Sequence, residues 1–332
     1  MAAFENPVFE IATAYRKTAA LIAAVNLDIF TIIGSSTLTV DQLVARTSAA
    51  PRGLRILCNY LTSMGLLTKD ESCYSLTQIS RTFLDAASPF AMGQTIEFLA
   101  APEMMFLFLD DPASYVRRGG SSGMAHIAPD NPVWVRFAKA MMPFAAATAR
   151  RVSAHVLDAY DPPFNVLDIA AGHGLYGIEI AKTFPEALIT AVDWAEVIAV
   201  AEENAAAAGV AERFTARPGN ALNIEWGSDY DLILLPNFLH HFDFETCVSI
   251  VKKVRTSLAV GGHALSVDFV PNEGGIEPPI PVMFAFQMLA TTPAGEAYTK
   301  KELNLMAQLA GFRGAATLAL SPTPETLIIF EQ

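Results

Sequence analysis

The second half of this 332-residue chain alternates apolar runs of strand length with segments of helical pattern. From Pro162 onward the runs are NVLDIA, LITAVD, RFTAR, YDLILLP and HALSVDFV. Alternation of this kind predicts βαβ units and a parallel sheet. Two further runs, AATLALS and ETLIIFE, are separated only by PTP and predict a closing antiparallel hairpin. The expected fold class is therefore α/β, with five parallel strands and a C-terminal hairpin.

A glycine-rich turn follows the first of these predicted strands. Gly172, Gly174 and Gly177 have the spacing GxGxxG and precede a helical segment. Glycine lets a backbone turn sharply and approach a ligand closely. Asp193 ends the next strand, where a carboxylate can accept hydrogen bonds from ribose hydroxyls. The pattern predicts a Rossmann-like domain with an adenosine-type cofactor, and both NAD and S-adenosylmethionine satisfy it.

Three features favour S-adenosylmethionine. Asp168 lies inside the first strand, where a charge needs partners such as loop amides or a ligand's ammonium group. The terminal hairpin is unusual for a dinucleotide-binding domain. The segment PNFLHHFDFETC places His240 and His241 at the carboxyl edge of the sheet, where ligands bind in open α/β folds. NAD-dependent hydride transfer remains the alternative.

Residues 1–90 predict helices followed by a hairpin, which is the element order of a winged helix. Helical spacing runs through 7–33, a short helix covers 40–46, and a third helix begins at Pro51 and ends at Gly65. The hairpin is LLTKDESCYSLT. Seven basic and seven acidic side chains balance in this region, so it lacks the positive charge of a DNA-binding domain. A packing or dimerisation module is favoured.

Residues 91–160 predict a helical connector that contributes to a substrate pocket. The segment is rich in Met and Phe, which form ordinary core and also line adaptable pockets for flat apolar ligands. Gly119, Gly120 and Gly123 predict a mobile loop within it. Residues 161–332 then form the cofactor-binding domain.

Composition excludes several classes of protein. A net charge of −12 disfavours nucleic acid and anionic membranes as partners. The apolar run from Ile11 to Ile33 is interrupted by charged residues, so it predicts a buried helix and not a membrane span. The three cysteines are scattered without a CxxC pair, and no metal-ligand cluster is visible. We therefore expect a cytoplasmic protein without disulfides or a metal.

Four motifs together carry a resemblance to a known family. GLRILCNYLTSMGLL, YSLT, VLDIAAGHG and YTKKELNLMAQLAGF resemble the small-molecule O-methyltransferases of the caffeic acid and hydroxyindole type, whose bacterial relatives act on polyketides, carotenoids and bacteriochlorophyll precursors. The resemblance covers nearly the whole chain. It implies a class I, S-adenosylmethionine-dependent enzyme of secondary metabolism and an intertwined homodimer formed through residues 1–90.

The resemblance also implies a set of cofactor-binding positions. Asn220 stands where the family has an Asp beside the adenine, and its amide can still bond the adenine edge. Pro236 replaces a cofactor-contacting Lys of the plant members, so that contact is lost. The full set is Asp168, Ala170, Gly172, Gly174, Asp193, Trp194, Gly219, Asn220, Ala221 and Pro236.

The same resemblance identifies His240 as the catalytic base and Asp268 as the acid that braces it. His241 replaces a family Asp. A second bracing Glu would fall at Ala297, which Glu296 misses by one position. The competing interpretation is that His240 only caps or packs. The substrate pocket is expected to contain Phe137, Met141, His241, Met283, Phe286 and Gln287.

The sequence thus predicts in-line methyl transfer to the hydroxyl of a small aromatic or polyketide-like compound, with His240 as general base. Methylation of carbon or nitrogen in a small molecule is an alternative. A nucleic-acid methyltransferase is disfavoured because LPNF at 235–238 is not the Asp/Asn-Pro-Pro-Tyr/Phe motif of enzymes that methylate DNA amino groups. A ligand-sensing winged-helix regulator is disfavoured by the neutral N-terminal region.

Overall fold

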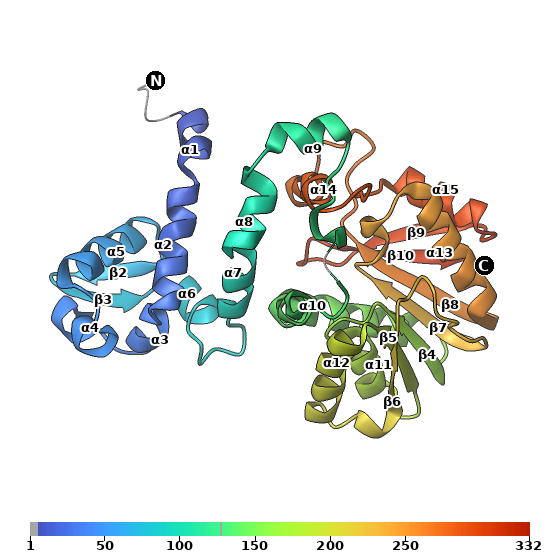
Figure 1. Cartoon of the computed structure of the whole chain (residues 1–332). Coiled ribbons are helices and arrows are strands. Elements are labelled where there is room, and N and C mark those ends of the chain that lie inside the picture. Colours follow the sequence, from blue (N-terminus) through green and yellow to red (C-terminus); the bar gives the residue numbers. More distant parts are fainter. Residues whose placement is uncertain (1–5, 127) are drawn as a thin grey trace. The chain divides into compact units, whose positions relative to one another are not determined.

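The computed structural model of the protein describes residues 6–126 and 128–332. The chain divides into two compact units between Met105 and Phe106. The first unit contains short helices and an antiparallel sheet in the order β1-β3-β2 (Figure 1). Its elements are α1 (Pro7–Thr13), α2 (Tyr15–Asn26), α3 (Ile29–Ile33), β1 (Leu38–Thr39), α4 (Val40–Thr47), α5 (Pro51–Ser63), β2 (Leu67–Asp70), β3 (Cys73–Leu76), α6 (Gln78–Phe83), α7 (Gly93–Leu99) and α8 (Pro102–Leu109), which continues across the division.

The predicted helical run over 7–33 is divided into three helices. Asp28 has a φ of 51°, a left-handed conformation that Asp tolerates better than most residues, and it separates α2 from α3. Helices α2 and α3 bury residues in the core of the unit, whereas α1 buries none. The expectation of one continuous helix is therefore wrong, whereas the expectation of burial is confirmed for α2 and α3 and wrong for α1.

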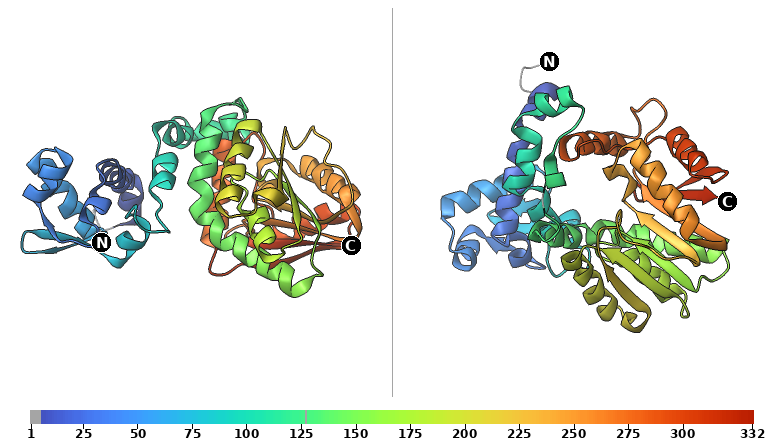
Figure 2. Two further views of the ribbon diagram at one scale, coloured as in Figure 1. Left: turned by 90° about the horizontal axis from the view of Figure 1, so that it is seen from below. Right: turned by 45° about the vertical axis from the view of Figure 1, so that its right-hand side comes forward.

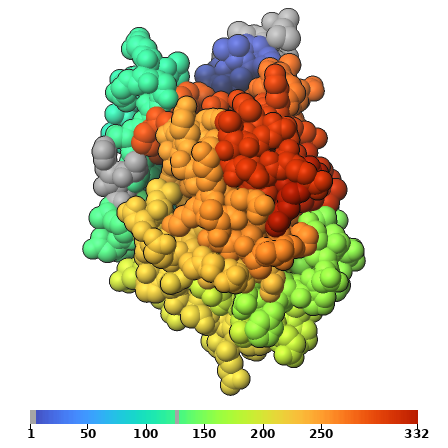
Figure 3. Space-filling model, turned by 90° about the vertical axis from the view of Figure 1, so that its right-hand side faces the viewer, coloured from blue at the N-terminus to red at the C-terminus, as the bar shows by residue number. Residues whose placement is uncertain are grey.

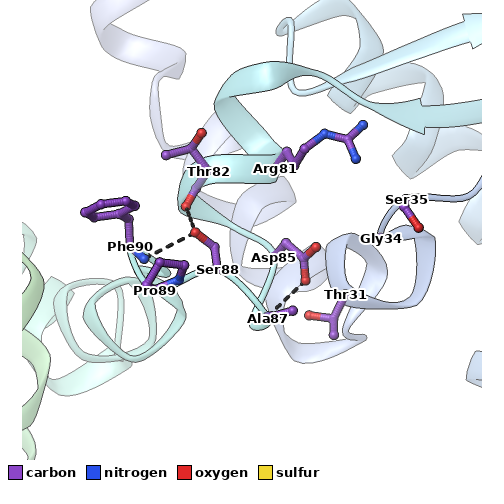
Figure 4. A pocket seen from close by; sticks show the side chains of 10 residues that line it. All are labelled: Thr31, Gly34, Ser35, Arg81, Thr82, Asp85, Ala87, Ser88, Pro89 and Phe90. Atoms are coloured by element: carbon purple, nitrogen blue, oxygen red, sulfur yellow. Dashed lines mark hydrogen bonds between the residues drawn. The ribbon is translucent and has the colours of Figure 1, made fainter.

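The predicted helices and hairpin between residues 40 and 77 are confirmed. Thr39 and Gln42 form a reciprocal capping box at the start of α4. Strands β2 and β3 pair with Asp70 opposite Cys73. An open hollow of about 680 Å³ lies between α3 and the segment 81–90 (Figure 4). In this segment the Ser88 hydroxyl donates a hydrogen bond to the Thr82 carbonyl and accepts one from Phe90 N. These three polar groups therefore bond one another.

The second unit contains the parallel sheet. Its helices are α9 (Pro112–Arg118), η1 (Gly123–His126), α10 (Pro132–Ala159), α11 (Leu175–Thr183), α12 (Ala195–Ala207), η2 (Ala211–Arg213), η3 (Leu239–His241), α13 (Phe244–Ser257), α14 (Pro279–Thr291) and α15 (Lys300–Leu309). Its strands are β4 (Asn165–Ile169), β5 (Leu188–Asp193), β6 (Phe214–Pro218), β7 (Tyr230–Pro236), β8 (Leu258–Asp268), β9 (Gly314–Ala319) and β10 (Thr326–Glu331). Over the whole described part of the chain, no helix is long and apolar enough to cross a membrane.

The strand order is β6-β5-β4-β7-β8-β10-β9. The first five strands in this order are parallel, and β10 enters antiparallel between β8 and β9. The predicted fold class, a parallel sheet closed by a C-terminal hairpin, is confirmed. The β8 strand is longer than its predicted apolar run, because it begins at Leu258 and ends at Asp268.

Helices cover both faces of this sheet (Figure 2). One core contains Val152 of α10, Ile178 of α11 and Ile198 of α12 against inward residues of β4, β5, β7 and β8. The opposite core contains Val251 of α13 and Met306 of α15. Figure 3 shows the outside of this second layer, where the orange segment of α13 adjoins the red C-terminal segment.

The parallel strands bring their carboxyl ends to one edge of the sheet. Strand β4 ends at Ile169, β5 at Asp193, β7 at Pro236 and β8 at Asp268. The glycine turn, both candidate acids and the histidine segment therefore meet along one edge, as ligand sites do in open α/β sheets.

The glycine segment 119–123 packs closely where a mobile loop was predicted. Ser121 N donates to the Thr292 carbonyl at 2.8 Å. A Cβ atom at Gly120 would collide with the backbone of Pro293. Gly120, and likewise Gly123 against Thr291, therefore permit close approach of two backbones at the end of α14.

Gly174 provides a stability test of the turn. Its φ is +74°, and a Cβ atom would lie 2.7 Å from the Ala201 side chain. Gly209 has a φ of +73° with nothing within 4 Å. Gly174→Ala should lower the unfolding free energy by about 2–4 kcal/mol, from strain plus overpacking, and Gly209→Ala by about 1 kcal/mol from strain alone. Urea unfolding measures both, and equal losses would contradict the packing argument.

Candidate functional site

The turn between β4 and α11 presents backbone to the edge of the sheet. Ala170, Gly172 and Gly174 all have positive φ, of 53°, 57° and 74°. A Cβ atom at Gly172 would meet nothing closer than the Ala170 carbonyl at 3.9 Å, so the turn is open at this point. The backbone at Gly172 is therefore accessible to a bound ligand.

Asp193 is held at the end of β5 by two backbone amides. Gly172 N donates to Oδ2 at 2.8 Å, and Trp194 N donates to Oδ1 at 2.7 Å. Burial raises the pKa of Asp193 to about 6, although both hydrogen bonds act in the opposite direction. Each carboxylate oxygen keeps acceptor capacity for a further hydroxyl donor.

Asp168 is fully buried in β4 and only partly satisfied. Gly177 N, in the first turn of α11, donates to Oδ2 at 3.0 Å. Oδ1 is buried and has no hydrogen-bond partner within the described residues. Burial raises the pKa of Asp168 to about 7; the bond from Gly177 acts against this increase, and the charge on Asp193 adds to it.

A cavity of about 350 Å³ lies beside Asp193, lined by residues 129–130, 194–196 and 218–220. The indole of Trp134 contacts that of Trp194 edge to face at 4.9 Å. Gly219 N donates to the Asp193 carbonyl. The Asn220 side-chain oxygen accepts Leu222 N, so part of its capacity is used locally. Ala221 is buried and its carbonyl accepts the Trp226 indole N–H.

His240 and Asp268 meet across the ends of β7 and β8. His240 Nδ1 lies 2.7 Å from Asp268 Oδ1, and Phe269 N donates to the same oxygen. The histidine is 4% exposed and also packs edge to face on Phe284. The second ring nitrogen, His240 Nε2, has no hydrogen-bond partner among residues 6–126 and 128–332. The arrangement orients one imidazole and leaves its second nitrogen available.

His241 lies beside His240, with ring centroids 4.3 Å apart. Burial and the neighbouring His240 both hold the pKa of His241 well below its usual range, so this ring is neutral. A second bracing acid is missing from the described contacts of His240. Glu296 is exposed, and Ala297 is buried among Phe284 and Met288.

The predicted pocket residues come from three elements. Phe137 and Met141 are half-buried on α10, and His241 belongs to η3. On α14, Met283 and Phe286 are largely exposed, and Phe286 contacts Tyr115 edge to face. Gln287 is half-buried on the same helix. The residue of α14 that contacts His240 is Phe284, which the sequence analysis missed.

Other side chains at this edge were also missed. Tyr176 and Asn237 lie near Asp168, and Trp134 joins Trp194. Their signal was weak because Tyr176 and Trp134 fit ordinary helical patterns. Within the described residues no group of three His, Cys, Asp or Glu side chains could hold a metal ion. The hollow of the first unit contains none of the predicted site residues.

A Rossmann-like sheet with this strand order, a glycine turn, a strand-end acid and a buried His–Asp pair defines a methyltransferase-type site. Comparison with known families agrees. Residues 108–313 match the model of the O-methyltransferase domain, and residues 9–86 match that of the O-methyltransferase dimerisation domain. The chain therefore belongs to the O-methyltransferase family.

Individual relatives support this assignment over nearly the full length. The phenazine O-methyltransferase PhzM of Lysobacter antibioticus is 26% identical, over 98% of this chain and 94% of its own. A solved protein of Nostoc punctiforme assigned as an O-methyltransferase is 42% identical, with a TM-score of 0.93 and 98% of both chains covered. Human N-acetylserotonin methyltransferase, solved in complex with SAM, shares the fold at 18% identity, with a TM-score of 0.85 and 100% and 99% coverage.

The raised pKa of Asp168 gives a pH-dependent cost to folding. The folded state binds the proton more tightly than the unfolded chain, whose ordinary Asp pKa is about 3.9. The stabilisation that this proton gives is complete below pH ~4 and is lost as pH rises to about 7, at about 1.4 kcal/mol per pH unit or less. Asp168→Asn should therefore be more stable than wild type at pH 8, and the advantage should shrink at pH 5.

Urea unfolding at the two pH values measures this advantage. Glu186→Gln, which changes an exposed acid of the same unit, is the matched control and should show no such trend. An Asp168→Asn variant less stable than wild type at pH 8 would show that the carboxylate is satisfied in the folded protein.

Proposed function

We propose that this O-methyltransferase uses S-adenosylmethionine to methylate a hydroxyl of a small aromatic or polyketide-like compound, with His240 as general base. The observation that carries the proposal is the 2.7 Å contact between His240 and Asp268 at the sheet edge that also holds the glycine turn and Asp193. The nicotinamide oxidoreductase considered from the sequence is not supported by the family assignment.

The residues at the edge fit this methyl donor. Asp193 can accept the ribose hydroxyls through oxygens that two amides already orient. The open turn at Gly172 admits the chain between ribose and amino acid, and Trp194 and Asn220 border the neighbouring cavity for an adenine ring. Asp168 Oδ1 offers a buried acceptor to a cationic group. The donor, when bound, supplies a methyl group on a positively charged sulfur.

The residues of the chain supply alignment and a proton acceptor. Holding two reactants in near-attack geometry contributes on the order of 7–11 kcal/mol. His240 Nε2 would accept the hydroxyl proton as the substrate oxygen takes the methyl group that the donor supplies. Asp268 fixes the ring through Nδ1 and stabilises the imidazolium that forms. A positioned base of this kind adds about 10²–10⁴-fold.

The surroundings of His240 favour a flat, apolar acceptor. Phe284 packs on His240 and stacks on Phe269 at 4.2 Å. His241 adds a neutral ring. The similarity to a phenazine O-methyltransferase supports an aromatic acceptor, and the proton-accepting histidine supports oxygen over carbon or nitrogen as the methylated atom.

The dimerisation domain over residues 9–86 supports a homodimer as the working form. Val8 and Ile11 of α1 are each 75% exposed in the single chain, as expected for a helix that a second copy covers. A monomer at micromolar concentration in sedimentation would contradict this.

Three free thiols agree with the expected cytoplasmic location.

Cofactor binding tests the donor. S-adenosylhomocysteine should bind the protein in calorimetry, and NAD should not, because the strand-end acid and buried Asp168 suit the former. Asp193→Ala should weaken S-adenosylhomocysteine binding by about 1.5–3 kcal/mol, the range for hydrogen bonds to a charged group. Tighter binding of NAD would refute the proposal, and an unchanged affinity in the variant would exclude Asp193 as the ribose ligand.

Turnover tests the base. With a phenolic acceptor found by screening, His240→Ala should lower kcat about 10²–10⁴-fold with little change in S-adenosylhomocysteine affinity. Asp268→Asn should cause a smaller loss, and His241→Ala a smaller one still. If His240→Ala kept near-normal turnover, His240 would not be the base, and catalysis would come only from holding the two reactants close together.

A further inference from the structure

Asn237 occupies an unusual position directly after β7. Its φ is 52°, in the left-handed region, and its backbone N–H bonds the Val267 carbonyl. Its side-chain Nδ2 donates to the Tyr176 hydroxyl at 3.5 Å. Its Oδ1 is buried and has no partner within the described part of the chain. A buried amide oxygen without a donor is unfavourable and calls for a ligand or another explanation.

Asp168 supplies a second unpaired acceptor of the same kind. It is fully buried, and its Oδ1 lacks a donor within residues 6–126 and 128–332. Strands β4 and β7 are neighbours, with Asp168 opposite Leu234, so both acceptors lie at the same edge. Tyr176 connects them, because it precedes Gly177, which binds Asp168, and its hydroxyl accepts from Asn237.

The electrostatic surroundings favour a positive donor. Glu325, Asp168 and Asp268 all act on the Tyr176 hydroxyl through their charges. Glu325 is buried and accepts a hydrogen bond from Thr148 at 2.9 Å. No Lys or Arg of the described chain forms an ion pair with these three carboxyl groups. An ammonium group, with three donors, no acceptor and a positive charge, matches two unpaired acceptors near three acids.

We propose that Asn237 is a specificity residue for the methyl donor: its Oδ1 and Asp168 Oδ1 together accept the α-ammonium group of the donor's amino-acid end, and Tyr176 is a positioning residue that holds the amide. This assignment rests on the proposed function, because the ammonium group belongs to the proposed methyl donor. It adds to that function a residue by which the chain distinguishes the amino-acid end from other adenosine thioethers.

Calorimetry with two ligands tests the inference. The probes are S-adenosylhomocysteine and its desamino analogue, in which hydrogen replaces the amino group. Wild type should bind the first at least tenfold more tightly. Asn237→Gly removes the side chain and tolerates the positive φ, and it should lower that ratio about tenfold with the desamino analogue bound as before. Asn237→Asp retains an acceptor and the left-handed preference and should keep the ratio. Tyr176→Phe should lower it by a smaller factor.

Controls separate this role from a structural one. Asn165→Ala changes a half-buried Asn at the opposite end of β4 and should leave both affinities unchanged. An equal loss of both ligands in Asn237→Gly would mean that Asn237 only shapes the turn, and the inference would be wrong. Decarboxylated S-adenosylhomocysteine gives a second comparison. If Asn237→Gly lost the preference for the ligand that carries the carboxylate, and not the preference for the one that carries the amino group, the inference would also be wrong. Failure of wild type to bind S-adenosylhomocysteine would instead refute the proposed function.

Discussion

The carboxylate of Asp168, buried inside the first parallel strand, constrains the site more than any other group. Its bond from Gly177 N fixes the first turn of α11 onto β4. The same contact excludes a side chain at residue 177, because a Cβ atom there would lie 2.7 Å from Ile189 and 3.1 Å from Asp168 Oδ2. The helix start then sets the conformation of the turn at 170–174, whose Gly172 amide orients Asp193. One buried charge thus links the strand, the helix and Asp193, the acid that we propose binds the ribose.

The same charge makes the site unfavourable for the empty protein. Burial raises the pKa of both Asp168 and Asp193, to about 7 and about 6, because neither has a cationic side-chain partner among the described residues. Native folds retain such features where a ligand compensates them. A positively charged methyl donor would favour the ionised form of these acids, so ligand binding and proton release should be coupled.

The sequence predicted the parts of this structure that depend on periodicity and chain order. Five apolar runs identified the parallel strands. His240, which follows β7, and Asp268, which ends the neighbouring strand β8, were expected to meet. The orientation of α14 could not be predicted, since that helix is apolar on all sides. The sequence analysis chose Met283 and Phe286, whereas Phe284 contacts the histidine. Asn237 was also missed, because its left-handed conformation and its bond to Tyr176 arise only from the three-dimensional arrangement.

The positions of the acids match the movement of charge during methyl transfer. In the proposed reaction the donor would carry its positive charge on sulfur beforehand, and Asp168 and Asp193 lie at the sheet edge proposed to hold it. Afterwards the sulfur would be neutral, and the proton taken from the substrate would make His240 positive, 2.7 Å from Asp268. The net charge of the site would therefore be conserved, while the positive charge moves from one acidic group to the other. A single bracing acid is sufficient for this, because Asp268 needs to stabilise one charge that did not exist beforehand. The absence of an acid at Ala297 and the neutral His241 beside the base fit that requirement, since a further buried carboxylate would lack a cation until the reaction occurs.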